Sequence, residues 1–457
     1  MPVSGFPELL PQQRFVELAV IDQLRRTFEL HGFAPLETPA VESLDTLLRK
    51  GEIDKEVYVL RRLNAEASGG TPGKKGGAAG GEGDSGLGLH FDLTVPFARF
   101  VLENAGHLEF PFRRYQIQKV WRGERPQTGR YREFTQADID IVAKDELPFH
   151  HDVEVARVMA EALAELIFLP PVRMQVNNRR LIEGFYLGLG AKDTSAVMRA
   201  IDKLDKIPAA VVCASLVDDA GLTDEQAAKC LQLAEIRSAD TSFVEQVRAL
   251  GIEHELLDQG LAELAAVIEG CAAITASNGG RVSVEADLRI ARGLDYYTGT
   301  VFETRMSGHE SLGSICSGGR YDSLASDAKV RYPGVGISLG LTRLLMPLLQ
   351  RGELAGSRSV PSVVLVALVD EESRATSDAI AQQLRARGIA TEVAASAQKF
   401  GKQIRYAERR GIPYVWFPDS GEVKDIRSGD QTPADAADWI PDPADLKPTV
   451  ITKDDTQ

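Results

Sequence analysis

The stretch ARGLDYYTGTVFE, residues 291–303, concentrates groups that can bind a ligand. Arg292, Tyr296 and Tyr297 stand within six residues, at a predicted bend beside glycine. A guanidinium group can neutralise a phosphate or a carboxylate, and a phenol can donate or accept a hydrogen bond. A strand end that only faced solvent would not need so many polar groups, so we interpret the stretch as part of a binding site.

The segment RRYQIQKVWRGERPQTGRYREFTQADIDIV, residues 113–142, is predicted to form two strands joined by a polar turn. Successive side chains on a strand point to opposite faces, and one face of the second strand carries Phe134, Gln136, Asp138 and Asp140. Gln136 and Asp140 are separated by about 13 Å, at about 3.3 Å per residue, and could bind opposite ends of a small ligand. A hairpin whose charges only face water is the alternative, which the polar pair beside Phe134 disfavours.

Arginines also gather in the turn of this hairpin and near the end of a glycine-rich segment. The turn carries Arg125, Arg130 and Arg132, which suit phosphate groups. In GVGISLGLTRLL, Arg343 is predicted to lie in the first turn of a helix, where exposed N–H groups favour anions. The glycines that would let a ligand approach the backbone there are Gly334, Gly336 and Gly340. A glycine-rich strand packed beneath a helix explains this segment equally well.

The composition indicates a folded chain of several domains. The 457 residues include 44% hydrophobic and 26% charged residues, and about two to four domains are expected at this length. We see no signal peptide and no apolar run of about 18 residues, so no membrane span is expected. The four cysteines form no C-x-x-C pair, which argues against structural zinc and favours a reducing, cytoplasmic location. The net charge of −14 argues mildly against general nucleic-acid binding, but basic segments at 113–132 and 399–410 would allow local binding of a polyanion.

Periodicity divides the rest of the chain into recognisable segments. A helix is predicted over 15–31, almost wholly helical structure over 183–275, and alternating strands and helices after a linker near 351–362. Residues 69–88 contain ten glycines and are predicted to be a mobile loop, for which the sequence offers no function. CSGGRYDSL, which begins at Cys316, is interpreted as a turn.

Together these segments resemble the class II aminoacyl-tRNA synthetases, and most closely the histidyl-tRNA synthetase family. GFAPLETPAVE is similar to the dimer-interface motif of the class around Pro39, VWRGERPQTGRYREFTQADIDI to its second motif and PGVGISLGLTRLL to its third. RGLDYYTGTVFE resembles the signature that distinguishes the histidine enzymes. FDLTVPFARF resembles the Asp-Leu-Thr form of the amino-acid-binding segment. The resemblance covers nearly the whole chain.

The resemblance implies an α+β fold with three parts. A class II catalytic domain on a six-stranded antiparallel sheet is expected at residues 1–182 and 276–350, split by a helical insertion domain at 183–275 that lies over the tRNA acceptor stem. A C-terminal α/β anticodon-binding domain is expected at 360–457. The implied enzyme is a homodimeric histidine–tRNA ligase that requires Mg²⁺. It activates L-histidine with ATP to histidyl-adenylate and transfers the acyl group to the 3′ end of histidine tRNA.

The resemblance also implies roles for individual residues. The residues it assigns to histidine binding are Asp92, Thr94, Arg122, Gln136, Asp140, Arg292, Tyr296 and Tyr297. The residues it assigns to ATP binding are Arg122, Glu124, Arg130, Phe134 and Arg343. Arg292 and Arg122 are the implied catalytic residues, because they would contact the reacting carboxylate and the α-phosphate.

Three other readings compete with a histidine enzyme. One is a catalytically idle paralogue, the regulatory subunit of ATP phosphoribosyltransferase, which Arg292 in an intact signature and residues 360–440 both oppose. The others are a different class II synthetase, such as a prolyl or threonyl enzyme, and a plain RNA-binding protein. One departure from the third motif is also notable, because Thr342 stands where many class II members carry an acid.

Overall fold

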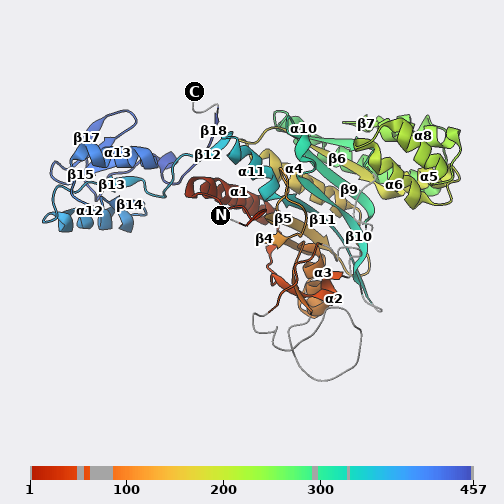
Figure 1. Ribbon diagram of the computed structural model, residues 1–457, viewed down its shortest axis with the longest axis horizontal. Coiled ribbons are helices and arrows are strands. Elements are labelled where there is room, and N and C mark those ends of the chain that lie inside the picture. Colours follow the sequence, from red (N-terminus) through yellow and green to blue (C-terminus); the bar gives the residue numbers. More distant parts are fainter. Residues whose placement is uncertain (1–2, 49–55, 62–85, 291–296, 327–329, 454–457) are drawn as a thin grey trace, which may run out of the picture. The chain divides into compact units, whose positions relative to one another are not determined.

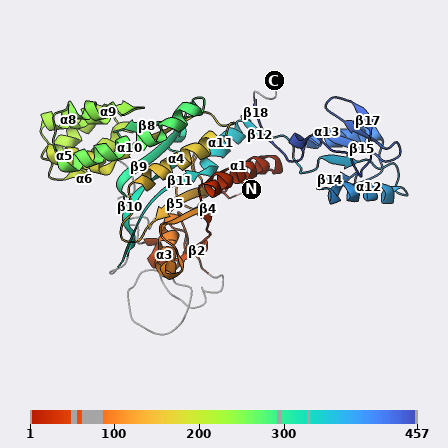
Figure 2. The ribbon, with the colours of Figure 1, turned by 180° about the vertical axis from the view of Figure 1, so that it is seen from behind.

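The computed structural model describes residues 3–48, 56–61, 86–290, 297–326 and 330–453 (Figures 1 and 2). The chain forms two compact units. The first comprises Met1–Pro7 and Gln23–Met346, and the second comprises Glu8–Asp22 and Pro347–Gln457. The predicted N-terminal helix is α1, Pro11–Leu30. The domain boundaries drawn from the sequence remain a prediction.

The first unit is built on a nine-stranded sheet. Its strands, in spatial order, are β1 (Ala34–Pro35), β4 (Phe112–Trp121), β5 (Glu133–Val142), β11 (Arg331–Gly340), β10 (Cys316–Ser326), β9 (Tyr297–Met306), β6 (Val172–Asn178), β8 (Val282–Asp287) and β7 (Arg237–Ser238). The six strands from β4 to β6 in this order are antiparallel to their neighbours. The predicted six-stranded sheet is therefore present, and β1, β8 and β7 widen it.

The segment CSGGRYDSL is not a turn, because it forms most of β10 at the centre of the sheet. Its glycines admit neighbouring strands closely: a Cβ added to Gly318 would lie 2.1 Å from the backbone oxygen of Gly336 on β11. Glycine in a strand interior often marks such close backbone approach. The sequence interpretation was wrong because the need for glycine here arises from a strand more than ten residues away.

Helices cover the sheet and stabilise it by burying apolar side chains. α4, His150–Ala164, contacts β5 and β11, and α10, Glu255–Ser277, contacts β6 and β8. The buried positions of α4 recur at helical spacing, as in Val155, Met159 and Leu163. A small sheet of β2 (Val41–Ser43) and β3 (Leu87–Leu89) accompanies the helices α2 (Leu44–Leu47) and α3 (Thr94–Asn104).

The segment between β6 and β8 is helical, apart from the short strand β7. Its helices are α5 (Arg179–Gly188), α6 (Thr194–Ile201), α7 (Ala209–Asp218), α8 (Asp224–Glu235), α9 (Phe243–Arg248) and α10. Of these helices, α5, α6 and α8 lie near the β7 end of the sheet (Figures 1 and 2). Thr223 and Gln226 form a capping box at the start of α8, which satisfies backbone N–H groups that the helix leaves unpaired.

Among the described residues, α10 is the one helix that is long and apolar enough to cross a membrane by length and composition. Its contacts are those of a core helix. A Cβ added to Gly260 would lie 2.2 Å from the backbone nitrogen of Leu181 on α5, and one added to Gly270 would lie 2.2 Å from Cγ1 of Val153 on α4. Glycine therefore lets α10 pack closely against both helices.

The second unit has its own five-stranded sheet. The strand order is β14 (Thr391–Val393), β13 (Val364–Val366), β15 (Tyr414–Phe417), β16 (Glu422–Asp425) and β17 (Gln431–Pro433). β13 is parallel to β14 and β15, and the connecting helices are α12 (Arg374–Ala386) and α13 (Phe400–Arg410). A separate pair, β12 (Leu354–Gly356) and β18 (Val450–Thr452), completes the unit. The alternation of strands and helices predicted for this region is confirmed.

Candidate active site

A polar cavity of about 80 Å³ lies where β5 and β11 lead into the hairpin turn and α11 (Leu341–Gln350). The residues that line it are Arg122, Glu124, Gly129, Arg130, Tyr131, Phe134, Gln136, Ser314, Ile315, Ser317, Ser338, Gly340 and Arg343. Pairing of β5 with β11 brings Gln136 opposite Gly340, although the two are about two hundred positions apart. Six of the residues that the resemblance assigns to substrate binding, together with Gly340, therefore line one cavity.

Three arginines, Arg122, Arg130 and Arg343, line this cavity. Arg343 donates from Nε to the Gly129 carbonyl at 2.9 Å and from Nη1 to the Ser314 carbonyl at 2.7 Å. Burial lowers the pKa of Arg343 below its usual value, and the positive charges of Arg130 and Arg122 lower it further. The fold holds these three positive charges close together although they repel one another. The cavity is therefore a favourable binding site for an anion.

Glu124 is the acidic side chain in the lining of this cavity. Its carboxylate lies 3.4 Å from Arg130 and 3.8 Å from Arg122. Arg122 also donates from Nε to the Phe91 carbonyl at 3.0 Å, and its guanidinium carbon lies 5.1 Å from the centroid of the Phe134 ring. These contacts fix Arg122 between backbone, aromatic ring and carboxylate.

Thr342 explains the departure from the third motif. Its hydroxyl accepts a hydrogen bond from the backbone N–H of Thr135 at 2.8 Å, and the side chain is buried. The residue that replaces the usual acid thus joins the start of α11 to β5. We conclude that position 342 has a structural role in this chain.

The polar side chains of Gln136 and Asp140 on β5 are buried and contact residues of neighbouring strands. Gln136 donates to the Ser338 hydroxyl at 2.6 Å. The Asp140 carboxylate lies 2.7 Å from Nη2 of Arg114 and accepts from the Tyr321 hydroxyl at 2.8 Å. Both faces of β5 are covered, so these polar groups are buried like the apolar ones. Buried polar groups need such partners.

Asp138 lies between Gln136 and Asp140 on the same face. Burial raises the pKa of Asp138 to about 7, and the nearby Asp140 raises it, whereas Arg114 and a hydrogen bond from Ser338 lower it. Among the described residues, its Oδ1 atom finds no hydrogen-bond partner. Gln136, Asp138 and Asp140 therefore differ in their partners, although they lie on one face of the same strand.

The glycines of β11 make room for side chains of the protein. A Cβ added to Gly336 would lie 2.1 Å from Oδ1 of Asp140, and one added to Gly334 would lie 2.5 Å from the Tyr321 ring. Of the three glycines thought to let a ligand approach the backbone, only Gly340 lines the cavity. Sequence reasoning missed this because it depends on which side chain the neighbouring strand presents.

The remaining predicted residues have separate positions. Asp92 accepts a hydrogen bond at 3.1 Å from the backbone N–H of Val95, in the first turn of α3, whose first residue is Thr94. Tyr297, the first residue of β9, packs over Gly319, where an added Cβ would lie 3.0 Å from its ring. Four of the predicted binding residues that the structure describes do not line the cavity: Asp92, Thr94, Asp140 and Tyr297.

Arg292 and Tyr296 lie outside the described residues, as do residues 69–85 of the glycine-rich insert. The backbone on either side of 291–296 is anchored. Asn177 donates to the Ile290 carbonyl at 2.8 Å, and the Thr298 hydroxyl donates to Asp322 at 2.6 Å.

Sequence reasoning missed Arg114, Tyr321 and Ser338. The alternation along 113–122 could have revealed Arg114, because it places this residue on the same face as Gln116 and Arg122. Tyr321 was hidden in a segment interpreted as a turn. Nothing in the local sequence marks Ser338.

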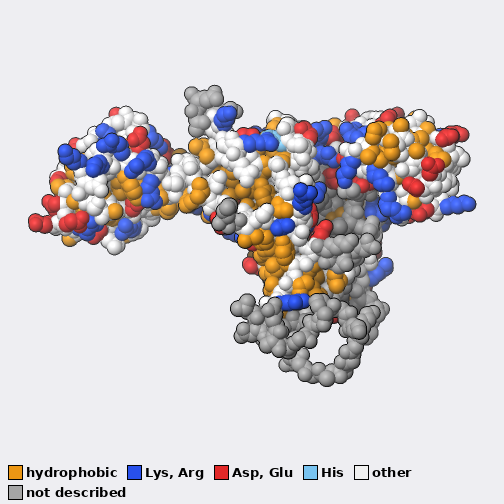
Figure 3. Space-filling view, in the orientation of Figure 1, with side chains coloured by type: hydrophobic (Ala, Val, Ile, Leu, Met, Phe, Trp, Pro, Cys, Tyr) orange, Lys and Arg blue, Asp and Glu red, His pale blue; other side chains and the backbone are white. Residues whose placement is uncertain are grey.

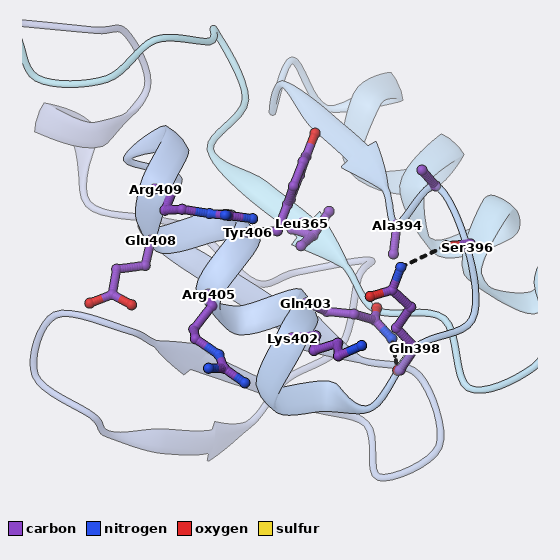
Figure 4. Close-up of a pocket in the computed structure, with 11 residues that line it drawn as sticks. Leu365, Ala394, Ser396, Gln398, Lys402, Gln403, Arg405, Tyr406, Glu408 and Arg409 are labelled. Atoms are coloured by element: carbon purple, nitrogen blue, oxygen red, sulfur yellow. Dashed lines mark hydrogen bonds between the residues drawn. The ribbon is translucent and has the colours of Figure 1, made fainter.

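The second unit contains a larger groove, of about 470 Å³, beside α13 (Figure 4). Lys402, Arg405 and Arg409 line it from the helix, and Ser396 and Gln398 line it from the loop after β14. Gln403 fixes this loop by donating to the Gln398 carbonyl at 2.5 Å. Basic side chains are frequent on the visible face of the unit, among acidic ones (Figure 3). The basic segment 399–410 is therefore one face of a groove.

The antiparallel sheet, with its arginine-lined cavity, and the separate α/β unit define a class II aminoacyl-tRNA synthetase. Residues 81–344 match the family model "Histidyl-tRNA synthetase", and residues 362–428 match "Anticodon binding domain". The chain belongs to the histidyl-tRNA synthetase family, whose activity is the ATP-driven ligation of histidine to its tRNA.

Relatives agree with this assignment over the full length. The chain is 60% identical to the histidine–tRNA ligase of Cutibacterium acnes, over 98% of each chain, and 57% identical to that of Micrococcus luteus, over 99% of each. Among solved structures it is similar to the histidyl-tRNA synthetase of a Nostoc species, with a TM-score of 0.80, 33% identity and coverage of 94% of this chain and 96% of that one. These matches favour the ligase over the regulatory paralogue, the other class II enzymes and the plain RNA-binding protein.

Proposed function

We propose that the cavity at β5 and β11 is where this chain activates L-histidine with ATP, before the acyl group passes to histidine tRNA. The observation that carries the proposal is the convergence of Arg122, Arg130 and Arg343 on a cavity with Gln136 in its wall. Activation is an in-line attack of the amino-acid carboxylate on the α-phosphorus, which brings negative groups together. Positioning and charge neutralisation are therefore its main requirements.

The arginine end of the cavity suits the nucleotide. Arg343 and Arg130 would bind the outer phosphates, and Arg122 would bind the α-phosphate and the amino-acid carboxylate. The two carbonyl bonds of Arg343 fix its guanidinium before substrate arrives, so little reorganisation is needed at the moment of reaction. The ring of Phe134 would stack on adenine.

The β5 end suits histidine. Gln136, Asp92 and Thr94 would bind the α-ammonium. The Oε1 atom of Gln136 is buried and, among the described residues, has no hydrogen-bond partner, so a substrate N–H would satisfy it. Asp140 and Tyr297 would bind the imidazole.

Tyr296 would shape the imidazole pocket, and Arg292 would be the principal catalytic residue. A site built to hydrogen-bond both ring nitrogens can reject analogues that lack them by about 10⁴ or more without editing.

Glu124 is the residue that would hold Mg²⁺. Magnesium in nucleotide sites is usually bound by one or two carboxylates together with phosphates and water, so a single carboxylate beside the phosphate-binding arginines fits this ion. When bound, Mg²⁺ would share the neutralisation of phosphate charge.

We also propose that the enzyme is a cytoplasmic homodimer, with the segment around Pro39 at its interface. The motif resemblance supports this proposal. A solution mass of one chain, measured by light scattering, would contradict it.

Pyrophosphate exchange with each amino acid in turn tests the proposed function. Histidine alone should stimulate exchange, and Arg292→Ala should abolish it without loss of the folded state. Equal stimulation by proline or threonine would overturn the substrate assignment. Near-normal exchange by Arg292→Ala would remove that residue from catalysis.

A further inference from the structure

Arg114 is a charged residue buried in the middle of the antiparallel sheet. It lies on β4, its side chain is 0% exposed, and it is directly opposite Asp140 on β5. A buried guanidinium loses its hydration, so a negative charge or several acceptors must compensate for it. The contacts of Arg114 identify the Asp140 carboxylate as the compensating negative charge.

One ion pair and one hydrogen bond, from different strands, hold the Asp140 carboxylate. Nη2 of Arg114 lies 2.7 Å from Oδ2, and the Tyr321 hydroxyl donates to Oδ1 at 2.8 Å. The guanidinium itself is held by the Phe97 ring, whose centroid is 4.3 Å away, and by Gln116, whose Oε1 accepts from Nη1 at 3.3 Å. The ion pair at Oδ2 and the hydrogen bond at Oδ1 together restrict the orientation of the carboxylate.

Two carboxylates stand near this one cation, and the geometry distinguishes them. Asp140 pairs with Arg114, whereas Asp138, two residues earlier on the same face, is hydrogen-bonded by Ser338. Gly336 leaves the space that Asp140 occupies. Arg114 therefore selects Asp140 as the ion-paired acceptor of this strand.

We propose that Arg114 is a positioning residue for the amino-acid substrate, which holds the Asp140 carboxylate oriented to accept an N–H group of the histidine imidazole. The inference rests on the proposed function, in which Asp140 binds that ring. A carboxylate has about four lone-pair sites, so one that pairs with a guanidinium and accepts a phenol O–H can still accept an N–H. An ion-paired carboxylate accepts hydrogen bonds but does not donate them, so it selects a ring nitrogen that carries hydrogen.

The test is histidine-dependent pyrophosphate exchange by the full-length protein. Arg114→Met should raise the KM for histidine about 10-fold or more, with the KM for ATP changed less than about 2-fold, because the lost interaction acts on one substrate only. Arg114→Lys, which keeps the charge, should restore part of the affinity. Arg113→Met is the matched control, because Arg113 is the adjacent residue on β4 and pairs with Glu154.

A double-mutant cycle with Asp140→Asn separates positioning from a merely structural role. If Arg114 acts through Asp140, adding Arg114→Met to Asp140→Asn should change the histidine KM by less than about 2-fold. The double variant also removes both buried charges, so it remains informative if Arg114→Met alone does not fold.

Three outcomes would have different meanings. Effects that multiply in the double variant, or equal rises in both KM values, would overturn the role of Arg114. An unchanged histidine KM in Asp140→Asn would overturn the role of Asp140 and the inference with it. A wild-type protein without histidine-dependent exchange would instead overturn the proposed function itself.

Discussion

The cavity in the first unit and the groove beside α13 in the second both gather basic side chains, but they hold them differently. In the cavity, Arg343 is bound to two backbone carbonyls, and the space is only about 80 Å³. In the groove, Lys402, Arg405 and Arg409 are exposed, and the space is about 470 Å³. The first arrangement suits individual phosphate or carboxylate groups held in one geometry, and the second suits a large polyanion.

The two sets of cations differ in how much hydration and rotational freedom they have lost before a ligand binds. A buried, hydrogen-bonded guanidinium has already given up water and rotational freedom, so its effect on a bound phosphate is strong and specific. An exposed lysine keeps its hydration and its rotational freedom until the ligand binds. Its attraction for a phosphate is largely screened beyond about 8 Å at physiological salt. Substitutions in the two regions should therefore differ in size and in salt dependence.

Among substitutions in the cavity and the groove, Arg343→Ala should have the largest effect. Loss of one preorganised charged donor should lower kcat/KM for pyrophosphate exchange by about 100-fold or more, at both low and high salt. Arg351→Ala, just beyond the end of α11, is the control and should change little. An Arg343→Ala enzyme within about 3-fold of wild type would mean that the cavity does not bind phosphate.

Gly336→Ala should have the next largest effect, although it removes no functional group. The added methyl would lie 2.1 Å from Oδ1 of Asp140 and 2.7 Å from the Ile139 carbonyl, so the carboxylate must move. We expect the KM for histidine to rise about 10-fold, because small displacements of a positioned group are costly. Gly106→Ala, where an added Cβ meets nothing within 4 Å, is the control. Equal losses in both variants would show a general effect on folding.

A smaller effect is expected in the groove. Changing Lys402 and Arg405 together to Gln should lower kcat/KM for tRNA charging about 10-fold at low salt and reduce the salt slope of tRNA binding by about one to two. Exchange without tRNA should stay unchanged. Lys424 and Lys447, changed to Gln in the same unit, form the matched control. If tRNA charging by the groove variant equals that of the control, this face of α13 does not contact tRNA.

The smallest effect concerns the stability of the first unit and its pH dependence. The pKa of Asp138 is raised to about 7, so the folded protein binds a proton that the unfolded chain has lost above about pH 4. The free energy of unfolding of the wild-type protein should therefore decrease as pH rises from about 4 to about 7. The Asp138→Asn variant should not show this decrease. In differential scanning calorimetry, the melting temperature of Asp138→Asn relative to that of the wild type should be higher at pH 8 than at pH 5. Asp419→Asn, at an exposed carboxylate of the second unit, is the control, and an equal pH response in both would refute the burial argument.

Much of the site was predictable from local pattern. Alternation along 133–142 requires Gln136, Asp138 and Asp140 to share a face, because successive side chains of a strand point in opposite directions. The helical start that carries Arg343 was predictable for the same kind of local reason. The roles of the individual residues remain predictions, and Arg292 and Tyr296 lie outside the described residues.

Only the tertiary structure determined which of these side chains contact one another or line the same cavity. Arg122 and Arg343 share a cavity because β5 pairs with β11, a contact between segments about two hundred residues apart that no local periodicity encodes. The partner of Asp140 was likewise decided by strand register, which sets Arg114 opposite it and Gly336 beside it. Sequence period determines the face on which a side chain lies, whereas its neighbours depend on long-range pairing, and the electrostatics of this site come from those neighbours.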